Sequence, residues 1–139
     1  MTLTPFIHFN GNAEEAFSFY KSVLGGNFSR LARSKDIATE EYPVSEADAN
    51  KIMTIELSLN NNVLLMGSDV PEFAGKVNEN ENRSKISVNA DSAEQASRIF
   101  MGLSKDGDVE IPLSEHNGNH FAMFRDKYGI EWMINFEGA

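Results

Sequence analysis

Residues 9–26 read FNGNAEEAFSFYKSVLGG, and this stretch carries the clearest helical pattern in the chain. Its apolar residues recur at spacings of three and four, which lines one face of an α-helix; they are Ala13, Ala16, Phe17, Tyr20, Val23 and Leu24. Asn12 is expected to cap the helix N-terminus, and the pair Gly25–Gly26 to end it. Strands are predicted on either side, over residues 3–9 and 28–33.

The same pattern returns later in the chain. Ala93-Glu94-Gln95-Ala96 repeats Ala13-Glu14-Glu15-Ala16 at an offset of 80 (93 − 13). Around each helix the predicted elements follow the same order. In the first half, the helix and the strand after it are followed by a hairpin with strands at 53–59 and 63–66. In the second half, the predicted elements are a strand at 85–89, a helix at 93–103, a strand at 109–113 and a hairpin over 120–125 and 130–136. Ala and Glu are common in helices, but the shared order around the motif predicts an internal duplication.

Each half is therefore expected to be a β-α-β-β-β module, and the chain a single domain over 1–139. The first module spans 1–69, a polar linker spans 70–83, and the second module spans 84–139. The fold class is α+β, with the two tandem modules forming a curled mixed β-sheet. A helix covers only one face of its sheet, so the bare faces can form a concave cleft, the natural position for a ligand.

Composition excludes several classes of protein. The net charge is −9, from 12 basic and 21 acidic residues, which argues against non-specific nucleic-acid binding. There is no cysteine, so disulfides, thiolate catalysis and cysteine metal ligands are excluded. No window approaches the roughly 18 apolar residues of a membrane span, and the N-terminus does not resemble a signal peptide. These features favour a cytoplasmic protein without a membrane or nucleic-acid partner.

Three stretches resemble one known family: PFIHFNGNAEEAFSFYKSVLGG at 5–26, LLMGSD at 64–69 and DGDVEIPLSEHNGNHFAMFRDKYGIEWMIN at 106–135. They are similar to the PhnB-like branch of the vicinal oxygen chelate superfamily, which has the glyoxalase/bleomycin resistance fold. The resemblance implies paired β-α-β-β-β modules, a small-molecule ligand and commonly a homodimer.

Metal-dependent members of that superfamily hold a divalent ion that chelates two neighbouring substrate oxygens. The positions of this chain that match those metal ligands fall at about Thr4, Ser84 and Met133. None of the three is a good ligand, because hard divalent ions prefer carboxylate or imidazole groups. Thr54 and Asn117 also stand where the branch often has histidine and tryptophan. No metal and no cofactor are therefore predicted. Some proteins of the branch are labelled ubiquinone-pathway methyltransferases, but the chain lacks the glycine-rich nucleotide loop of that chemistry.

His8 is the titratable group that stands out. By strand alternation it shares a face with Thr4 and Phe6, while Ile7 and Phe9 suit the helix side. It could act as a general base or ligand donor, or it could be satisfied by a neighbour. The candidate ligand-pocket residues are Thr4, Phe6, His8, Thr54, Glu56, Met66, His120, Glu131, Met133 and Asn135.

Two further patterns allow alternatives. Glu131 shares its face with Met133 and Asn135; it could be a cleft carboxylate with a raised pKa or an exposed strand carboxylate. EHNGNH at 115–120 could suggest a metal cluster, but it is interpreted as a polar loop in which His120 is the better pocket candidate.

The turn Asn10-Gly11-Asn12 has one glycine, fewer than a phosphate loop generally uses, and is interpreted as a strand-to-helix connection. No catalytic residue is assigned. The sequence favours a metal-independent small-molecule-binding protein; the alternative is a divergent metal-dependent lyase, isomerase or dioxygenase, or a metal-free enzyme built on His8 and a carboxylate.

Overall fold

A computed structural model describes residues 1–41, 43–79, 81 and 83–138 of the chain. The chain divides into two compact units, Met1–Val77 and Asn78–Ala139, and each is considered by itself.

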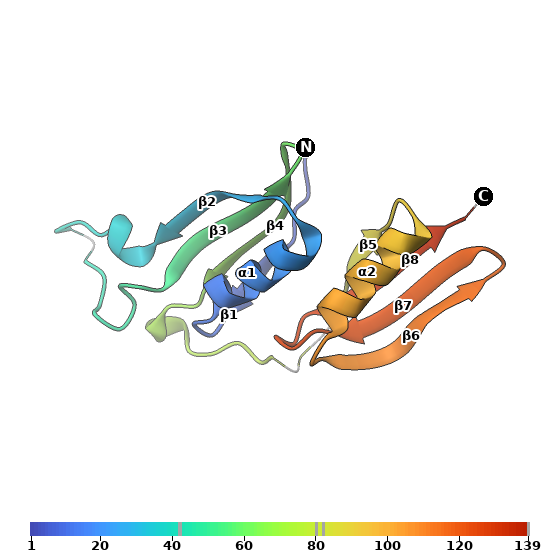
Figure 1. The fold of residues 1–139 in the computed structure, drawn as a ribbon. Coiled ribbons are helices and arrows are strands. Elements are labelled where there is room, and N and C mark those ends of the chain that lie inside the picture. The colour runs from blue at the N-terminus through green and yellow to red at the C-terminus, as the bar shows by residue number, and fades with distance from the viewer. Residues whose placement is uncertain (42, 80, 82, 139) are drawn as a thin grey trace. The chain divides into compact units, whose positions relative to one another are not determined.

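The first unit is a four-stranded mixed sheet with one helix. Its elements are β1 (Phe6–Phe9), α1 (Ala13–Leu24), β2 (Asn27–Arg33), the 3₁₀ turn η1 (Ser34–Asp36), β3 (Ile52–Leu59), β4 (Asn62–Asp69) and the 3₁₀ turn η2 (Glu72–Ala74). The strand order is β1-β4-β3-β2, in which β1 runs parallel to β4 and the other neighbours are antiparallel (Figure 1).

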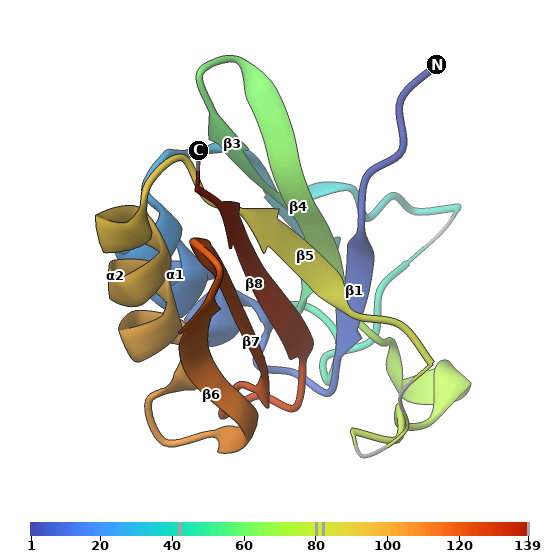
Figure 2. The same ribbon diagram turned by 90° about the vertical axis from the view of Figure 1, so that its right-hand side faces the viewer.

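The second unit has the same plan. It contains β5 (Ile86–Asn89), α2 (Ala93–Ser104), β6 (Asp108–His116), β7 (Asn119–Arg125) and β8 (Glu131–Glu137), in the order β5-β8-β7-β6 (Figure 2). The predicted α+β class and the repeated β-α-β-β-β order are confirmed. The eight strands form two separately hydrogen-bonded four-stranded sheets.

Helix α1 packs on its sheet through the face that the spacing predicts. Ala13, Ala16, Phe17 and Tyr20 are all fully buried. The ring of Phe17 meets that of Phe9 edge-on at 6.0 Å, and a Cβ added to Gly67 of β4 would lie 2.7 Å from it. Glycine at 67 therefore lets the helix approach the strand closely, and it fixes which sheet face α1 covers.

Helix α2 uses the same arrangement with smaller side chains. Ala96, Ile99 and Leu103 are buried, and Phe100 meets Phe124 of β7 edge-on at 5.5 Å. Ser92 caps this helix as predicted, because its Oγ accepts the backbone N–H of Gln95 at 3.0 Å.

The N-terminus of α1 differs from the expectation. Asn12 occupies the cap position, but its side chain makes no capping bond, and its Oδ1 is buried without a hydrogen-bond partner among the described residues. Asp69, at the end of β4, supplies the cap instead. Its Oδ1 accepts the N–H of Gly11 at 3.1 Å and of Ala13 at 2.9 Å, and its Oδ2 accepts the N–H of Ile52 at 2.8 Å.

A second buried carboxylate organises the β7–β8 turn. Asp126 Oδ1 accepts the N–H of Tyr128 at 2.8 Å and of Ile130 at 3.1 Å, while Oδ2 accepts the indole N–H of Trp132 at 2.8 Å. The DKYGIEW stretch is therefore explained by a turn built on the buried Asp126 carboxylate, which accepts three N–H groups.

Two details of the repeat are corrected. The segment EHNGNH is a tight hairpin between β6 and β7, because Asn117 (φ 54°) and Gly118 (φ 84°) both adopt the left-handed conformation of a two-residue turn. In addition, the offset of 80 between the two helices does not extend to the strands before them, because exposure in β1 and β5 matches at an offset of 79, with Ile7 equivalent to Ile86.

Candidate functional site

One face of each sheet carries no helix, and the predicted site residues of the first unit gather on such a face. Phe6, Met66 and Glu56 are register partners on β1, β4 and β3, so their side chains form one row across the sheet. Register partners in neighbouring strands point to the same side of the sheet. The row therefore places an aromatic ring, a thioether and a carboxylate next to one another.

The next row is centred on His8. Its register partner is Ser68, and His8 Nδ1 lies 3.2 Å from Ser68 Oγ. Thr54 continues this side of β3 two residues before Glu56, and both Thr54 and Ser68 are buried. The His8 ring also lies 5.3 Å from that of Phe6. The predicted placement of His8 on the helix-free face is correct, and a seryl hydroxyl satisfies one of its nitrogens.

Two of the predicted residues have more specific surroundings. Glu56 accepts a hydrogen bond from the Oγ of Ser29 at 3.2 Å, and that hydroxyl lies 2.6 Å from the Oγ of Ser58. Thr4 lies before the first residue of β1, outside the regular strand. Glu56 therefore belongs to a small polar group at the β2–β3 side of the face.

The helix-free face of the second sheet combines thioethers and a ring with amides. Ser87, Met133 and Met123 form one row across β5, β8 and β7. Asn89, Asn135 and Phe121 form the next row, and Asn135 Nδ2 donates to the Oγ of Ser87 at 2.8 Å. Only Met133 and Asn135 of these are among the candidates from sequence.

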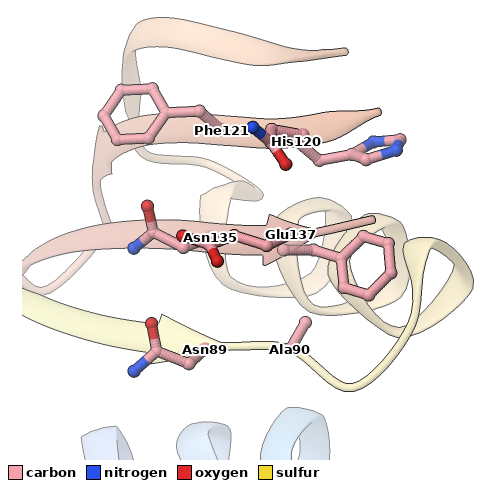
Figure 3. Close-up of a pocket in the computed structure, with 8 residues that line it drawn as sticks. Asn89, Ala90, His120, Phe121, Asn135 and Glu137 are labelled. Carbon is pink, nitrogen blue, oxygen red and sulfur yellow. The ribbon is translucent and has the colours of Figure 1, made fainter. Parts of the chain in front are cut away.

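This second row borders an open pocket of about 610 Å³, where β5 and β8 end and β7 begins (Figure 3). Asn89, Asn135 and Phe121 point to one side of the sheet there, and His120 points to the other (Figure 3). The signal that could have found Phe121 and Asn89 was the register, since both pair directly with Asn135. Register depends on the turn at Asn117–Gly118, which was not recognised as a hairpin.

His120 is separated from the other predicted residues of its unit. Its register partner is Phe136, whose ring lies 5.6 Å away, and both belong to the side that α2 covers. Glu131, Met133 and Asn135 alternate with Trp132 and Ile134 and face the opposite way. His120 and Asn135 nevertheless both line the pocket, where their side chains point to opposite sides of the sheet (Figure 3).

Glu131 is neither an exposed carboxylate nor an unpaired one. Its side chain is 5% exposed, its Oε2 contacts the Lys85 ammonium, and its Oε1 lies 2.9 Å from Nη2 of Arg125. Arg125 Nη1 also donates to the carbonyl oxygens of Glu79 and Gly129. Two cations pair with Glu131, so the group ties β8 to β7 and to the start of β5, and the alternative of an exposed strand carboxylate is wrong.

The donor set does not fit a chelated divalent ion. The positions matching the superfamily's ligands hold a hydroxyl at Thr4, a hydroxyl at Ser84 and a thioether at Met133, and Met133 lies between Ser87 and Met123 in its row. In the described ranges, no three His, Asp or Glu side chains come together as a possible metal centre.

The turn at the start of α1 is also unsuited to an anion. A phosphate there would need the N–H groups of the first helical turn. The Asp69 carboxylate already accepts the N–H of Ala13, the first helical residue, and that of Gly11 in the preceding turn, and its negative charge occupies the position.

Comparison with known proteins agrees with this architecture. The model of the family described as 3-demethylubiquinone-9 3-methyltransferase matches residues 1–135. The crystal structure of PA1353 from Pseudomonas aeruginosa is 33% identical to this chain, with a TM-score of 0.84 over 99% of this chain and 98% of that one.

Two more distant structures share the fold. The PhnB protein of Bacillus cereus is 24% identical, with a TM-score of 0.70 over 98% of this chain and 99% of that one. A glyoxylase/bleomycin resistance protein/dioxygenase domain from Frankia sp. EAN1pec is 11% identical, with a TM-score of 0.65 over 100% of this chain and 93% of that one. Neither helix within the described residues is long and apolar enough to cross a membrane.

Proposed function

The chain belongs to the 3-demethylubiquinone-9 3-methyltransferase family, in the PhnB-like branch of the glyoxalase/bleomycin resistance superfamily, and from this premise we propose that it binds a small organic molecule without a metal ion. The observation that carries the proposal is the row Phe121, Asn135 and Asn89 beside an open pocket of about 610 Å³. Pockets of this size, with an apolar wall and a few oriented polar groups, are typical of small-molecule sites.

The lining favours a particular kind of ligand. Phe121 offers a ring surface, and the amides of Asn135 and Asn89 can each donate and accept hydrogen bonds. Glu137 at the rim disfavours an anion. We therefore expect a compact, partly aromatic or conjugated molecule, neutral or cationic, that carries both donors and acceptors.

Metal independence is supported by the chemistry of the ligand positions. Thr4, Ser84 and Met133 offer two hydroxyls and a thioether, which divalent ions that chelate substrate oxygens bind poorly. A metal-dependent lyase, isomerase or dioxygenase would need ligands from other positions. The methyl transfer in the family's description finds no support in the β1–α1 turn, where Asp69 occupies the helix N-terminus.

The test is a ligand screen by thermal shift, followed by calorimetry on the best binder. Asn135→Ala and the milder Phe121→Leu are expected to weaken binding by about tenfold. Asn27→Ala, at the exposed first residue of β2, is the matched control and should leave the affinity unchanged. Unaltered affinity in both pocket variants would place the ligand elsewhere.

Metal independence is tested on the same binder. Affinity should be the same before and after dialysis against a chelator, and the purified protein should hold substoichiometric metal. Stoichiometric tightly bound metal, or affinity lost on chelation and restored by one divalent ion, would contradict the proposal.

The family resemblance also supports two wider proposals, a homodimeric state and a cytoplasmic location. If the protein is a homodimer, its mass in sedimentation should be twice that of the 15.5 kDa chain. A monomeric mass at micromolar concentration would contradict the dimer. A cytoplasmic location predicts recovery in the cytosolic fraction.

A further inference from the structure

An open groove of about 590 Å³ lies in the first unit, away from the residues described above. It is bordered by η1, by residues 43–48 and by η2. Its lining is mainly apolar and includes Ile37, Pro43, Val44, Asp48, Pro71 and Phe73. The lining residues come from η1 and its C-cap, the 43–48 segment and the start of η2, and none of them belongs to a β-strand.

Large apolar side chains of the groove are exposed to solvent. Phe73 is 91% exposed and Ile37 is 54% exposed. A single exposed apolar residue needs no explanation, but two large ones beside an apolar groove mark an interaction surface. An open wall of this kind suits a segment of chain better than an enclosed small molecule.

The groove is held in shape by Asp48. Its carboxylate accepts the N–H of Glu72 at 3.0 and 3.3 Å and pairs with the Lys51 ammonium at 2.9 Å. Lys51 also donates to the carbonyl oxygen of Val70 at 3.1 Å. These contacts join the wall at 43–48 to the wall at 71–73, so a partner would meet a preformed surface.

The segment 36–50 carries Ile37 and the 43–48 wall of the groove; it is acidic in sequence and is called the acidic rim. Residues 36–50 contain five acidic side chains and no lysine or arginine; the acidic ones are Asp36, Glu40, Glu41, Glu46 and Asp48. Three cations that flank the acidic rim in sequence are engaged, since Arg33 pairs with Glu14 at 3.0 Å, Lys35 donates to Asn50, and Lys51 pairs with Asp48. A fourth, Lys76, lies three residues after Phe73. The surface therefore combines apolar walls with net negative charge.

We infer that this groove docks a basic amphipathic segment of a partner protein. Its apolar side chains would pack on Phe73 and Ile37, and its lysines or arginines would meet the acidic rim. A second copy packed groove to groove is disfavoured as the occupant, because two acidic rims would then face each other. An anionic membrane surface is disfavoured because it too would face the acidic rim.

The test uses the full chain and a synthetic helical peptide with leucines on one face and lysines on the other. The double variant Phe73→Ser/Ile37→Ser keeps every charge and should weaken peptide binding at least about tenfold. Met101→Ser, a substitution of a 68% exposed residue on α2, is the matched control and should bind as the parent does. Melting temperatures of all three proteins should agree, because the replaced side chains are exposed.

The charge requirement is tested separately. A peptide with glutamate in place of lysine should not bind, and Glu40→Gln/Glu41→Gln should weaken the lysine peptide about two- to fourfold at low salt. The proposal is overturned if the lysine peptide does not bind, if the serine double variant binds it unchanged, or if the glutamate peptide binds equally. Loss of a dimer in Phe73→Ser/Ile37→Ser, measured by sedimentation, would show instead that a second copy fills the groove.

Discussion

The carboxylate of Asp69 lies 2.9 Å from the backbone nitrogen of Ala13, the first residue of α1. The same side chain accepts the N–H groups of Gly11 and Ile52. One residue of β4 therefore fixes the start of the helix and the start of β3, and its negative charge lies at the positive end of the helix dipole.

Replacing this carboxylate should destabilise the protein. In Asp69→Asn, one of the two acceptor oxygens becomes an NH₂ group that faces a backbone donor, and the charge is lost. We expect the free energy of unfolding to fall by about 1–3 kcal/mol, measured by urea denaturation. Asp91→Asn removes an exposed acid beside the start of α2 and should change it by less than about 0.5 kcal/mol. Equal losses in the two variants would show that Asp69 acts only through general charge.

Glu131 should behave as a structural residue. Glu131→Gln leaves the Lys85 and Arg125 cations without their shared counter-ion, and both cations are only about one-fifth exposed, at 22% and 21%. We expect the free energy of unfolding to fall by about 1–3 kcal/mol. This loss is smaller than that for breaking a fully buried ion pair, because solvent still reaches the two cations. Glu56→Gln is the control on the other sheet and should cost less than about 0.5 kcal/mol. A stable Glu131→Gln variant with altered ligand binding would restore the ligand role instead.

His8 should contribute little to stability. It is exposed and has one hydroxyl contact, Nδ1 to Ser68 Oγ at 3.2 Å. His8→Ala is expected to lower the free energy of unfolding by less than about 1 kcal/mol in a denaturant titration. A loss of several kcal/mol would mean that the imidazole supports the β1–β4 pairing, and a role at the helix-free face would then lose its basis.

The groove beside η2 should be stable to mild acid. The hydrogen bond and charge of Lys51 and the N–H of Glu72 lower the pKa of Asp48 below its ordinary value of 3.8. A lowered folded-state pKa stabilises the folded state above the ordinary value, and that contribution disappears as the pH falls through the folded-state pKa. The NMR shift of the Glu72 amide should therefore move with a midpoint below 3.8. A midpoint above that value would show that the Asp48–Glu72 contact is not formed in solution.

Much of the fold follows from local patterns. The spacing of Ala13, Ala16, Phe17 and Tyr20 predicts α1 with its buried face, and the duplication predicts the second module in the correct order of elements. Both signals lie within short windows of sequence, where periodicity reflects burial directly.

Side-chain partners across the sheets were harder to predict because they depend on residues far apart in the sequence. The Asp69 cap spans 56 residues and the Lys85–Glu131 pair spans 46. The face of His120 depends on the two-residue turn at Asn117–Gly118, since a shift of one residue reverses every side chain in the strand. The Asn-Gly pair is itself a local hairpin signal, whereas the Asp69 cap and the Lys85–Glu131 pair have no counterpart in local patterns.

The two helix caps also form at different times during synthesis on the ribosome. Ser92 caps α2 through Gln95, three residues further on, so that cap can close as soon as the helix emerges. The Asp69 cap on α1 must wait until β4 has left the exit tunnel, because the carboxylate is 56 residues downstream of Ala13. The N-terminal helix, although made first, is completed only when the last strand of its own sheet arrives, and the nascent chain exposes its apolar face until then.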